Sequence, residues 1–227
     1  MHKVFYRTQH VRDLDIFYRE SGPADGPVLL LLHGYPTSSF MFRNLIPLLA
    51  HAYHLIAPDL PGFGFSDKPP ADQFQYTFDH LADVMQAFID SLEIKRFTIY
   101  IFDYGTLYQY QQGASDISLI APETYTLDQH FLDEPGNTDI QLDLLHDYRN
   151  NVALYPKFQE YFREEKPPLL AVWGNRDPFF LPTGADGYLR DNPNARVKFY
   201  ETGHFALETH IGEIAADILQ FLSRHMV

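Results

Sequence analysis

The sequence predicts an α/β fold in which a mostly parallel sheet is flanked by helices. Two observations lead to this prediction: apolar runs of strand length, and helical patterns that lie between them. Residues 28–32 are apolar at every position, as is typical of a strand buried on both faces of a parallel sheet. A helix capped by Ser38 or Ser39 follows, and residues 54–57 form another short apolar strand. This strand, helix and strand make one parallel crossover unit.

Similar patterns continue along the rest of the chain. Residues 10–20 alternate apolar and charged side chains, which indicates a half-exposed strand. Apolar residues spaced by three and four predict a helix over 78–92, and a β-branched and aromatic run at 97–102 predicts the next buried strand. The remaining expected elements are a short helix at 104–112, a short strand at 117–120, an irregular stretch at 122–136, helices at 140–150 and 156–165, strands at 169–173 and 196–200, and a closing helix at 211–222.

Composition excludes several classes of function. The 227 residues are 45% hydrophobic and 21% charged, which is typical of a globular protein, and no apolar run approaches the roughly 20 residues of a membrane span. A net charge of -13 disfavours nucleic acid as a partner. With no cysteine there is no disulfide, thiolate zinc site or cysteine nucleophile. The first residues lack the apolar core of a signal peptide, so we expect a cytoplasmic location.

Three chemistry-bearing residues each follow a predicted buried strand. Asp103 follows 97–102, Asp177 follows 169–173 and His204 follows 196–200. The carboxyl ends of parallel strands share one edge of the sheet, where open α/β sheets place their sites. Nucleophile, acid and histidine in this order match the chain order of the α/β-hydrolase triad.

Five short motifs occur in one order along the chain. They are HGYP at 33–36, APDLPGFGFSD at 57–67, DYG at 103–105, GNRDP at 174–178 and GHF at 203–205. With these motifs the sequence resembles the α/β hydrolases of the epoxide hydrolase and haloalkane dehalogenase branch. In that branch aspartate replaces the serine nucleophile.

The resemblance implies a role for each site residue. Asp103 would attack a saturated carbon and form an alkyl ester, because a carboxylate needs no base to act as a nucleophile. His204 would then deprotonate the water that hydrolyses the ester, while Asp177 orients the imidazole. Backbone N–H groups of Tyr35 and Tyr104 would form the oxyanion hole. The expected partners are a small apolar substrate and water, with no cofactor and no metal.

Relative to that family the chain is shortened after the nucleophile. We expect residues 1–107 to form the first part of the core, 108–166 a shortened helical cap, and 167–227 the last part of the core of one structural domain. The join would lie near Leu107 and Tyr108, and the strand at 117–120 would occupy the vacated strand position. Tyr148-Arg149-Asn150 resembles the cap segment whose tyrosine protonates an epoxide, which favours an epoxide over a haloalkane.

Each site residue also has an ordinary structural explanation. Asp103 is a good N-cap for a helix at 104–112, and Asp177 before proline is a common turn residue. His204 is one of eleven histidines and Tyr148 one of fifteen tyrosines, so solvated or packing roles are ordinary for both. His33 would serve loop architecture. No HExxH motif or paired histidine spacing indicates a metal site.

Two functions remain open on these grounds. The first is a hydrolase that forms an alkyl ester on a carboxylate, with an epoxide or haloalkane as substrate. The second is an inactive or impaired deletion variant of such a hydrolase, which keeps the triad but lacks a pocket wall. A serine esterase is disfavoured because no GxSxG motif occurs. The substrate and the oligomeric state stay undetermined.

Overall fold

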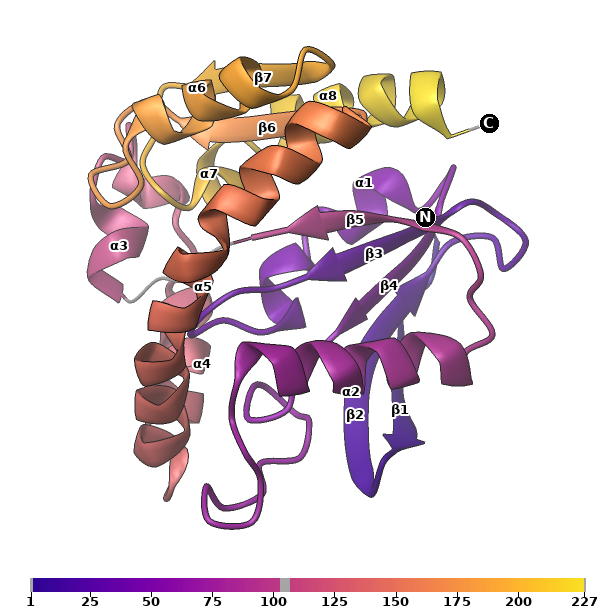
Figure 1. Cartoon of the computed structure of the whole chain (residues 1–227), viewed down its shortest axis with the longest axis vertical. Helices are drawn as coiled ribbons and strands as arrows, with labels where there is room; N and C mark the ends of the chain where they lie inside the picture. The colour runs from indigo at the N-terminus through magenta and orange to yellow at the C-terminus, as the bar shows by residue number, and fades with distance from the viewer. Residues whose placement is uncertain (1, 103–106, 227) are drawn as a thin grey trace. The chain divides into compact units, whose positions relative to one another are not determined.

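The computed structural model describes residues 2–102 and 107–226. The chain divides into two compact units, which are described separately (Figure 1). Residues 1–106 and 123–148 form the first unit, and residues 107–122 and 149–227 form the second. The three-part division expected from the sequence stays a prediction.

The first unit contains a five-stranded sheet in the order β1-β2-β4-β3-β5. The antiparallel pairs are β1 with β2 and β2 with β4, whereas β3 pairs in parallel with both β4 and β5. The strands are β1 (Phe5–Val11), β2 (Leu14–Ser21), β3 (Val28–Leu32), β4 (His54–Pro58) and β5 (Phe97–Ile101). Parallel pairing and flanking helices confirm the α/β fold class.

The first expected strand is a hairpin of two strands, so the prediction of one strand at 10–20 was wrong. The chain reverses between β1 and β2 at Arg12 and Asp13, which have φ angles of 49° and 64°. Two central residues with positive φ give the turn that matches the twist of a hairpin. Glycine and asparagine usually fill these positions, and the sequence has neither there.

Two helices of the first unit begin at side-chain caps. The Ser38 hydroxyl accepts a hydrogen bond from the Phe40 N–H, as one of the two expected caps, and Thr77 accepts from the His80 N–H. The helices are η1 (Ser39–Phe42), α1 (Ile46–Leu49), α2 (Phe78–Ser91) and α4 (Pro122–Leu132). The prediction for α2 is confirmed, whereas α4 was expected to be irregular.

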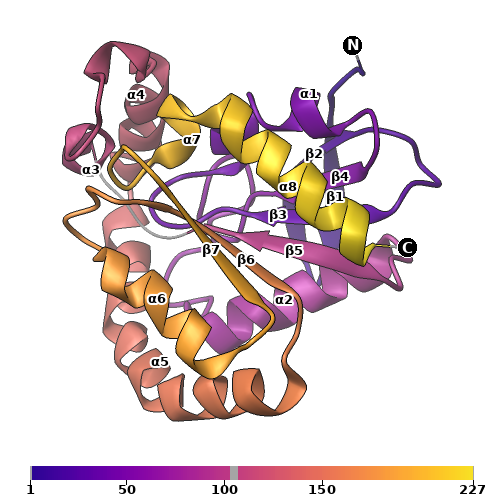
Figure 2. The same ribbon diagram turned by 90° about the horizontal axis from the view of Figure 1, so that it is seen from above.

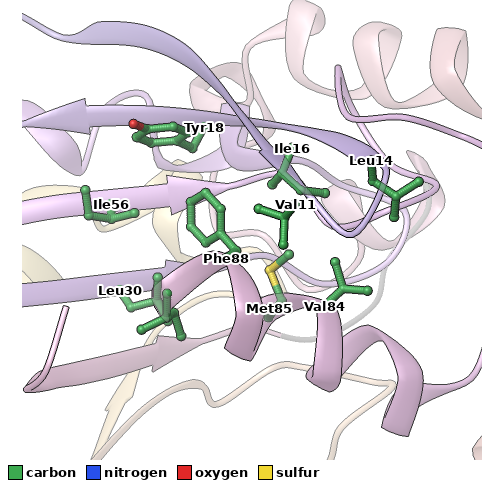
Figure 3. Packing of buried hydrophobic residues seen from close by; sticks show 10 residues of the cluster. Val11, Leu14, Ile16, Tyr18, Leu30, Ile56, Val84, Met85 and Phe88 are labelled. Atoms are coloured by element: carbon green, nitrogen blue, oxygen red, sulfur yellow. The ribbon is translucent and has the colours of Figure 1, made fainter. Parts of the chain in front are cut away.

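The main core of the first unit lies between α2 and the sheet (Figure 3). Val84, Met85 and Phe88 of α2 face apolar side chains of the strands, among them Leu30 and Ile56. Burial of each such side chain contributes about 1.5–3 kcal/mol, so this layer stabilises the helix on the sheet.

The second unit is built on a pair of parallel strands, β6 (Leu169–Gly174) and β7 (Ala195–Tyr200). Figure 2 shows helices α6 (Pro182–Asp191) and α8 (Ile211–His225) along this pair. The unit also contains α3 (Leu107–Gln111), η2 (Ile117–Leu119) and α7 (Ala206–Thr209). The expected strands at 169–173 and 196–200, the short helix before Gly113 and the closing helix are confirmed.

Two expectations for the middle of the chain were wrong. Residues 117–119 form a 3-10 helix with Ile117 and Leu119 exposed, so they do not supply a strand. Within residues 2–102 and 107–226, β5 therefore pairs with β3 alone. The helices expected at 140–150 and 156–165 are one helix, α5 (Asn137–Glu165). Pro156 lies inside it, where proline removes one internal hydrogen bond and the helix continues on both sides.

The burial of β5 also differs from the expectation. The strand is where the sequence predicted it, but Ile99 and Ile101 are 45% and 72% exposed. Strand side chains point to the two faces of the sheet and are buried where other elements cover them, and at an edge strand this cover is less complete. Within the described residues no strand lies on the outer edge of β5. Within the described part of the chain, no helix is both long and apolar enough to cross a bilayer.

Candidate active site

Two of the predicted catalytic side chains meet in the second unit. The His204 Nδ1–H donates a hydrogen bond of 2.8 Å to Asp177 Oδ2, and each side chain is only 4% exposed. Asp177 follows β6 and His204 follows β7, and these strands end in register with Gly174 opposite Tyr200. The parallel strands thus bring together two residues that are 27 positions apart in the sequence.

The Asp177 carboxylate is held by its own loop. Its second oxygen, Oδ1, accepts backbone N–H bonds from Phe179 at 2.9 Å and from Phe180 at 3.0 Å. Three N–H donors, including the imidazole, therefore converge on one buried carboxylate. These bonds offset the cost of burying it, and they fix the direction in which the carboxylate faces His204.

Backbone bonds join the two loops that carry this pair. The Asn175 and Arg176 N–H groups donate to the carbonyls of Tyr200 and Thr202, at 2.9 and 3.0 Å. Gly174 lies so near the other loop that a Cβ atom there would come within 2.0 Å of the Gly203 carbonyl oxygen. Only glycine allows this approach, which explains the glycine that begins the GNRDP motif.

The segment that ends α3 packs against the same loops. A Cβ atom on Gly203 would lie 1.8 Å from the Gln112 carbonyl oxygen, and one on Gly113 would lie 2.2 Å from that of Arg176. Gly113 also has a φ of 76°, which favours glycine. The Tyr110 ring stacks on Phe205, next to His204, with centroids 3.6 Å apart. The chain that follows residue 107 therefore packs against the loop that carries His204.

Aromatic rings surround the His204 imidazole. Phe180 is stacked on it, with centroids 5.1 Å apart and planes inclined by 25°. Phe205 and Phe179 contact it edge to face, at 5.2 and 6.3 Å. An imidazole packed among rings in this way has few orientations available. The pair can therefore act as an aspartate-oriented base, which is the role that the sequence predicted.

In the first unit, hydrogen bonds of the His33 side chain stabilise the loop that carries Tyr35. His33 is fully buried, its Nδ1–H donates to the Gly34 carbonyl at 2.8 Å, and its Nε2 accepts the Leu60 N–H at 3.0 Å. These bonds require a neutral imidazole with its proton on Nδ1. Burial lowers the pKa of His33 below its usual value, which agrees with this assignment. His33 therefore has the architectural role expected of it.

Asp59 organises the second motif of the first unit. Its carboxylate accepts backbone N–H bonds from Ser39 at 2.6 Å and from Phe65 at 2.8 Å. Gly64 has a φ of 51°, and a Cβ atom there would lie 2.1 Å from Asp59 Oδ2. The aspartate and the glycine of the motif at 57–67 thus depend on one another.

The roles of the other predicted site residues stay untested. Asp103 and Tyr104 lie outside the described residues, so the nucleophile and one oxyanion donor stay predictions. Tyr35 and Tyr148 belong to the first unit. Tyr35 precedes a cis peptide bond to Pro36, and Tyr148 lies on α5 with its ring 6.2 Å from that of Phe78. Their proposed roles are likewise untested.

Sequence reasoning missed three contributors to the site. They are the N–H groups of Phe179 and Phe180, and the ring of Tyr110. Asp-Pro-Phe-Phe at 177–180 does carry a signal for the first two, because an aspartate side chain often accepts N–H groups two or three residues ahead. No local pattern indicates the contact of Tyr110, which joins residues 95 positions apart.

Comparisons with known proteins identify the family and the fold of the chain. Residues 27–108 match the family described as alpha/beta hydrolase fold. An uncharacterized hydrolase of Saccharomyces cerevisiae is 36% identical over 285 aligned residues, covering 97% of this chain and 98% of the relative. A haloalkane dehalogenase of Psychrobacter cryohalolentis is 43% identical over 96 residues, which span 42% of this chain but only 31% of that enzyme.

Solved structures show the same architecture. The haloalkane dehalogenase DbeA of Bradyrhizobium elkani superimposes with a TM-score of 0.79 and 19% identity, covering 97% of this chain and 98% of that one. Cfl2 of Burkholderia cenocepacia gives a TM-score of 0.82 and 18% identity, covering 96% and 95%. At this level of identity the likeness establishes the fold.

Proposed function

The chain belongs to the α/β-hydrolase fold family and is related to haloalkane dehalogenases, and we propose that it hydrolyses its substrate through an ester on Asp103. The observation that carries this proposal is the buried His204–Asp177 hydrogen bond at the ends of neighbouring parallel strands. Such a pair is the second half of a nucleophile, acid and histidine triad. The Asp103 carboxylate, in the expected chain order, would complete it.

The first step is displacement at a saturated carbon. A carboxylate oxygen of Asp103 forms a bond to the substrate carbon, and the carbon–halogen bond breaks with its electron pair leaving on the halide. In an epoxide the ring carbon–oxygen bond breaks instead, and the oxygen takes a proton from the Tyr148 hydroxyl. The relatives named haloalkane dehalogenases support the halide reaction, whereas the motif at Tyr148 supports the epoxide reaction.

The second step is hydrolysis of the ester. Because the Nδ1–H of His204 donates to Asp177, the lone pair of a neutral imidazole is on Nε2. Nε2 takes a proton from water as the water oxygen attacks the ester carbonyl carbon. The oxyanion is stabilised by the N–H groups of Tyr35 and Tyr104. When it collapses, the bond to the alkoxide breaks, the alkoxide takes the proton of the imidazolium and leaves as the alcohol, and the new carboxyl group loses its proton to solvent, which restores the Asp103 carboxylate. The negative charge of Asp177 stabilises the imidazolium while it holds the proton.

A shortened cap is part of the proposal. The alignment with the yeast relative runs over 285 residues, whereas this chain has 227, and the family match ends at residue 108. Both observations support a join near Leu107 and Tyr108. The close packing of Gln112 and Gly113 against Arg176 and Gly203 indicates that the chain after the join still supports the histidine loop. This favours an active enzyme over an inactive deletion variant, and the cytoplasmic location expected from the sequence is part of the same proposal.

Replacing His204 tests the proposal. His204→Gln removes the base of the second step but leaves the first step intact, so a reactive haloalkane or epoxide should leave a stable adduct. Mass spectrometry of the digested protein should find the added mass on the peptide that contains Asp103. The turnover of the variant should fall by at least about 100-fold.

Two controls sharpen this experiment. The double variant Asp103→Asn, His204→Gln should form no adduct, because the nucleophile is gone. His51→Gln, at an exposed histidine of the first unit, should turn over like the wild type. If His204→Gln gave no adduct across a panel of both substrate classes, the chain would be the non-catalytic variant.

A further inference from the structure

Trp173 is the single tryptophan of the chain, and its indole contacts the loop of the catalytic acid. It lies on β6, four residues before Asp177. Its Nε1–H donates a hydrogen bond of 2.8 Å to the Phe180 carbonyl oxygen. A side chain of the strand thus reaches forward to the loop that the strand leads into.

Phe180 is held at three points. Its N–H donates to Asp177 Oδ1 at 3.0 Å, its carbonyl accepts from Trp173, and its ring is stacked on the His204 imidazole. The two backbone bonds fix the position and direction of the residue on both sides of its Cα atom. The ring therefore meets the imidazole in one orientation.

The residues on either side of Phe180 are partly exposed to solvent. The neighbouring residues Phe179 and Leu181 are 38% and 60% exposed, whereas His204 is buried. An exposed loop is ordinarily mobile, and loss of one of its two anchors would let the Phe180 ring move. The imidazole, which Asp177 holds only at Nδ1, would then be free to tilt about that bond.

From these contacts we propose that Trp173 is a positioning residue for His204 and acts through Phe180. The proposal rests on the function proposed above, because the orientation of His204 matters for the ester-hydrolysis step. The bond between Asp177 and Nδ1 sets the tautomer, and the Phe180 ring sets the plane in which Nε2 points. Attack of the substrate by Asp103 does not use His204 and does not depend on this arrangement.

Three variants test the proposal. Trp173→Phe keeps an aromatic ring but removes the N–H donor, Phe180→Leu keeps both backbone bonds but removes the ring, and the third variant combines them. The matched control is Phe199→Leu, at the β7 residue paired with Trp173, which removes a ring from the neighbouring strand and leaves the sequence of the loop unchanged.

The first measurement needs no activity. NMR signals of ring-labelled histidine report the environment of the imidazole, and the His204 signal is assigned by its loss in His204→Gln. We expect Trp173→Phe and Phe180→Leu to move this signal, the double variant to move it no further than Phe180→Leu, and Phe199→Leu to leave it in place. An unmoved signal in Trp173→Phe, or effects that add in the double variant, would overturn the proposal.

The second measurement separates the two chemical steps. After brief exposure to substrate, the adduct on Asp103 should form at the wild-type rate in Trp173→Phe but decay about tenfold more slowly, as a misaligned base predicts. Equal decay rates would count against the positioning role. If no adduct forms in any variant, including His204→Gln, the proposed function fails, and the NMR comparison still decides whether Trp173 orients the imidazole.

Discussion

Strands β3 and β5 are neighbours in the sheet with nearly the same kind of sequence, yet they differ in burial. Both are runs of five mostly apolar residues, paired in parallel from Val28 opposite Phe97 to Leu32 opposite Ile101. Leu30 of β3 is 2% exposed, whereas Ile101 of β5 is 72% exposed. The difference follows from position, because β3 has a strand on each edge and β5 has a described partner on one edge. An apolar run shows that a strand can be buried, and its neighbours decide whether it is.

The largest expected difference between the two strands is in stability. Leu30→Ala should lower the free energy of unfolding by about 2–5 kcal/mol, because it leaves a cavity in the core beneath α2. Ile101→Ala should lower it by less than about 1 kcal/mol, because solvent can occupy the vacated space. Urea unfolding followed by far-UV circular dichroism measures both. Equal losses would mean that Ile101 is covered in solution and would remove the contrast between the strands.

A second difference concerns the loop that follows β3. His33 joins that loop to Leu60, which follows β4, so the bond exists only because β3 has this neighbour. His33→Ala should cost about 1–3 kcal/mol, since it leaves the Leu60 N–H without its acceptor. The exposed His51→Ala serves as a matched control. A loss from His33→Ala no larger than that from His51→Ala would show that the link is dispensable.

The same histidine predicts a pH dependence. Burial lowers the pKa of His33 in the folded state from its usual value of 6.5, so the folded protein binds this proton less readily than the unfolded chain. Its contribution to stability is complete above pH 6.5 and is lost as the pH falls toward the lowered pKa. Unfolding curves collected downward from pH 7 should show the decline, and His33→Ala should lack this component of it.

The smallest expected effect is at the outer edge of β5. Ile101→Lys should change the free energy of unfolding by about 0.5 kcal/mol or less, because the side chain is exposed. It should nevertheless reduce self-association at high concentration, since a charged lysine on an apolar edge opposes strand addition. Light scattering over a concentration series compares it with the wild type. A large loss of stability would indicate that another part of the chain covers this edge.

The contrast between β3 and β5 also marks what sequence could predict. Strand and helix positions followed from local periodicity, as the agreement over α2 and β3 shows. The exposure of Ile101 did not, because it depends on a neighbour that no local pattern describes. The structure brings Asp177 and His204 together as the motif order predicted, and this could be foreseen because parallel strands place their carboxyl ends at one edge.

Other features carried weak or misleading signals. The hairpin turn places Arg12 at a positive φ angle, which an arginine rarely adopts, so the sequence gives little sign of the turn. Helix α4 buries polar residues such as Thr124 and Asp128, so it lacks an apolar stripe. Pro156 suggested a break where α5 continues. Helix α6 went unnoticed because Gly184 and Gly187 lower its intrinsic helix propensity.

The indole of Trp173 also provides a fluorescence signal from the second unit alone. Because the chain has a single tryptophan, fluorescence excited selectively in indole comes from the second unit, beside the loop of Asp177. The five-stranded sheet of the first unit contributes none of it. Far-ultraviolet dichroism, in contrast, senses the backbone of both units. Denaturation curves from the two signals will coincide if the two units unfold in one cooperative transition. They will differ if one unit unfolds before the other. The native sequence therefore contains its own probe of folding cooperativity, without any label.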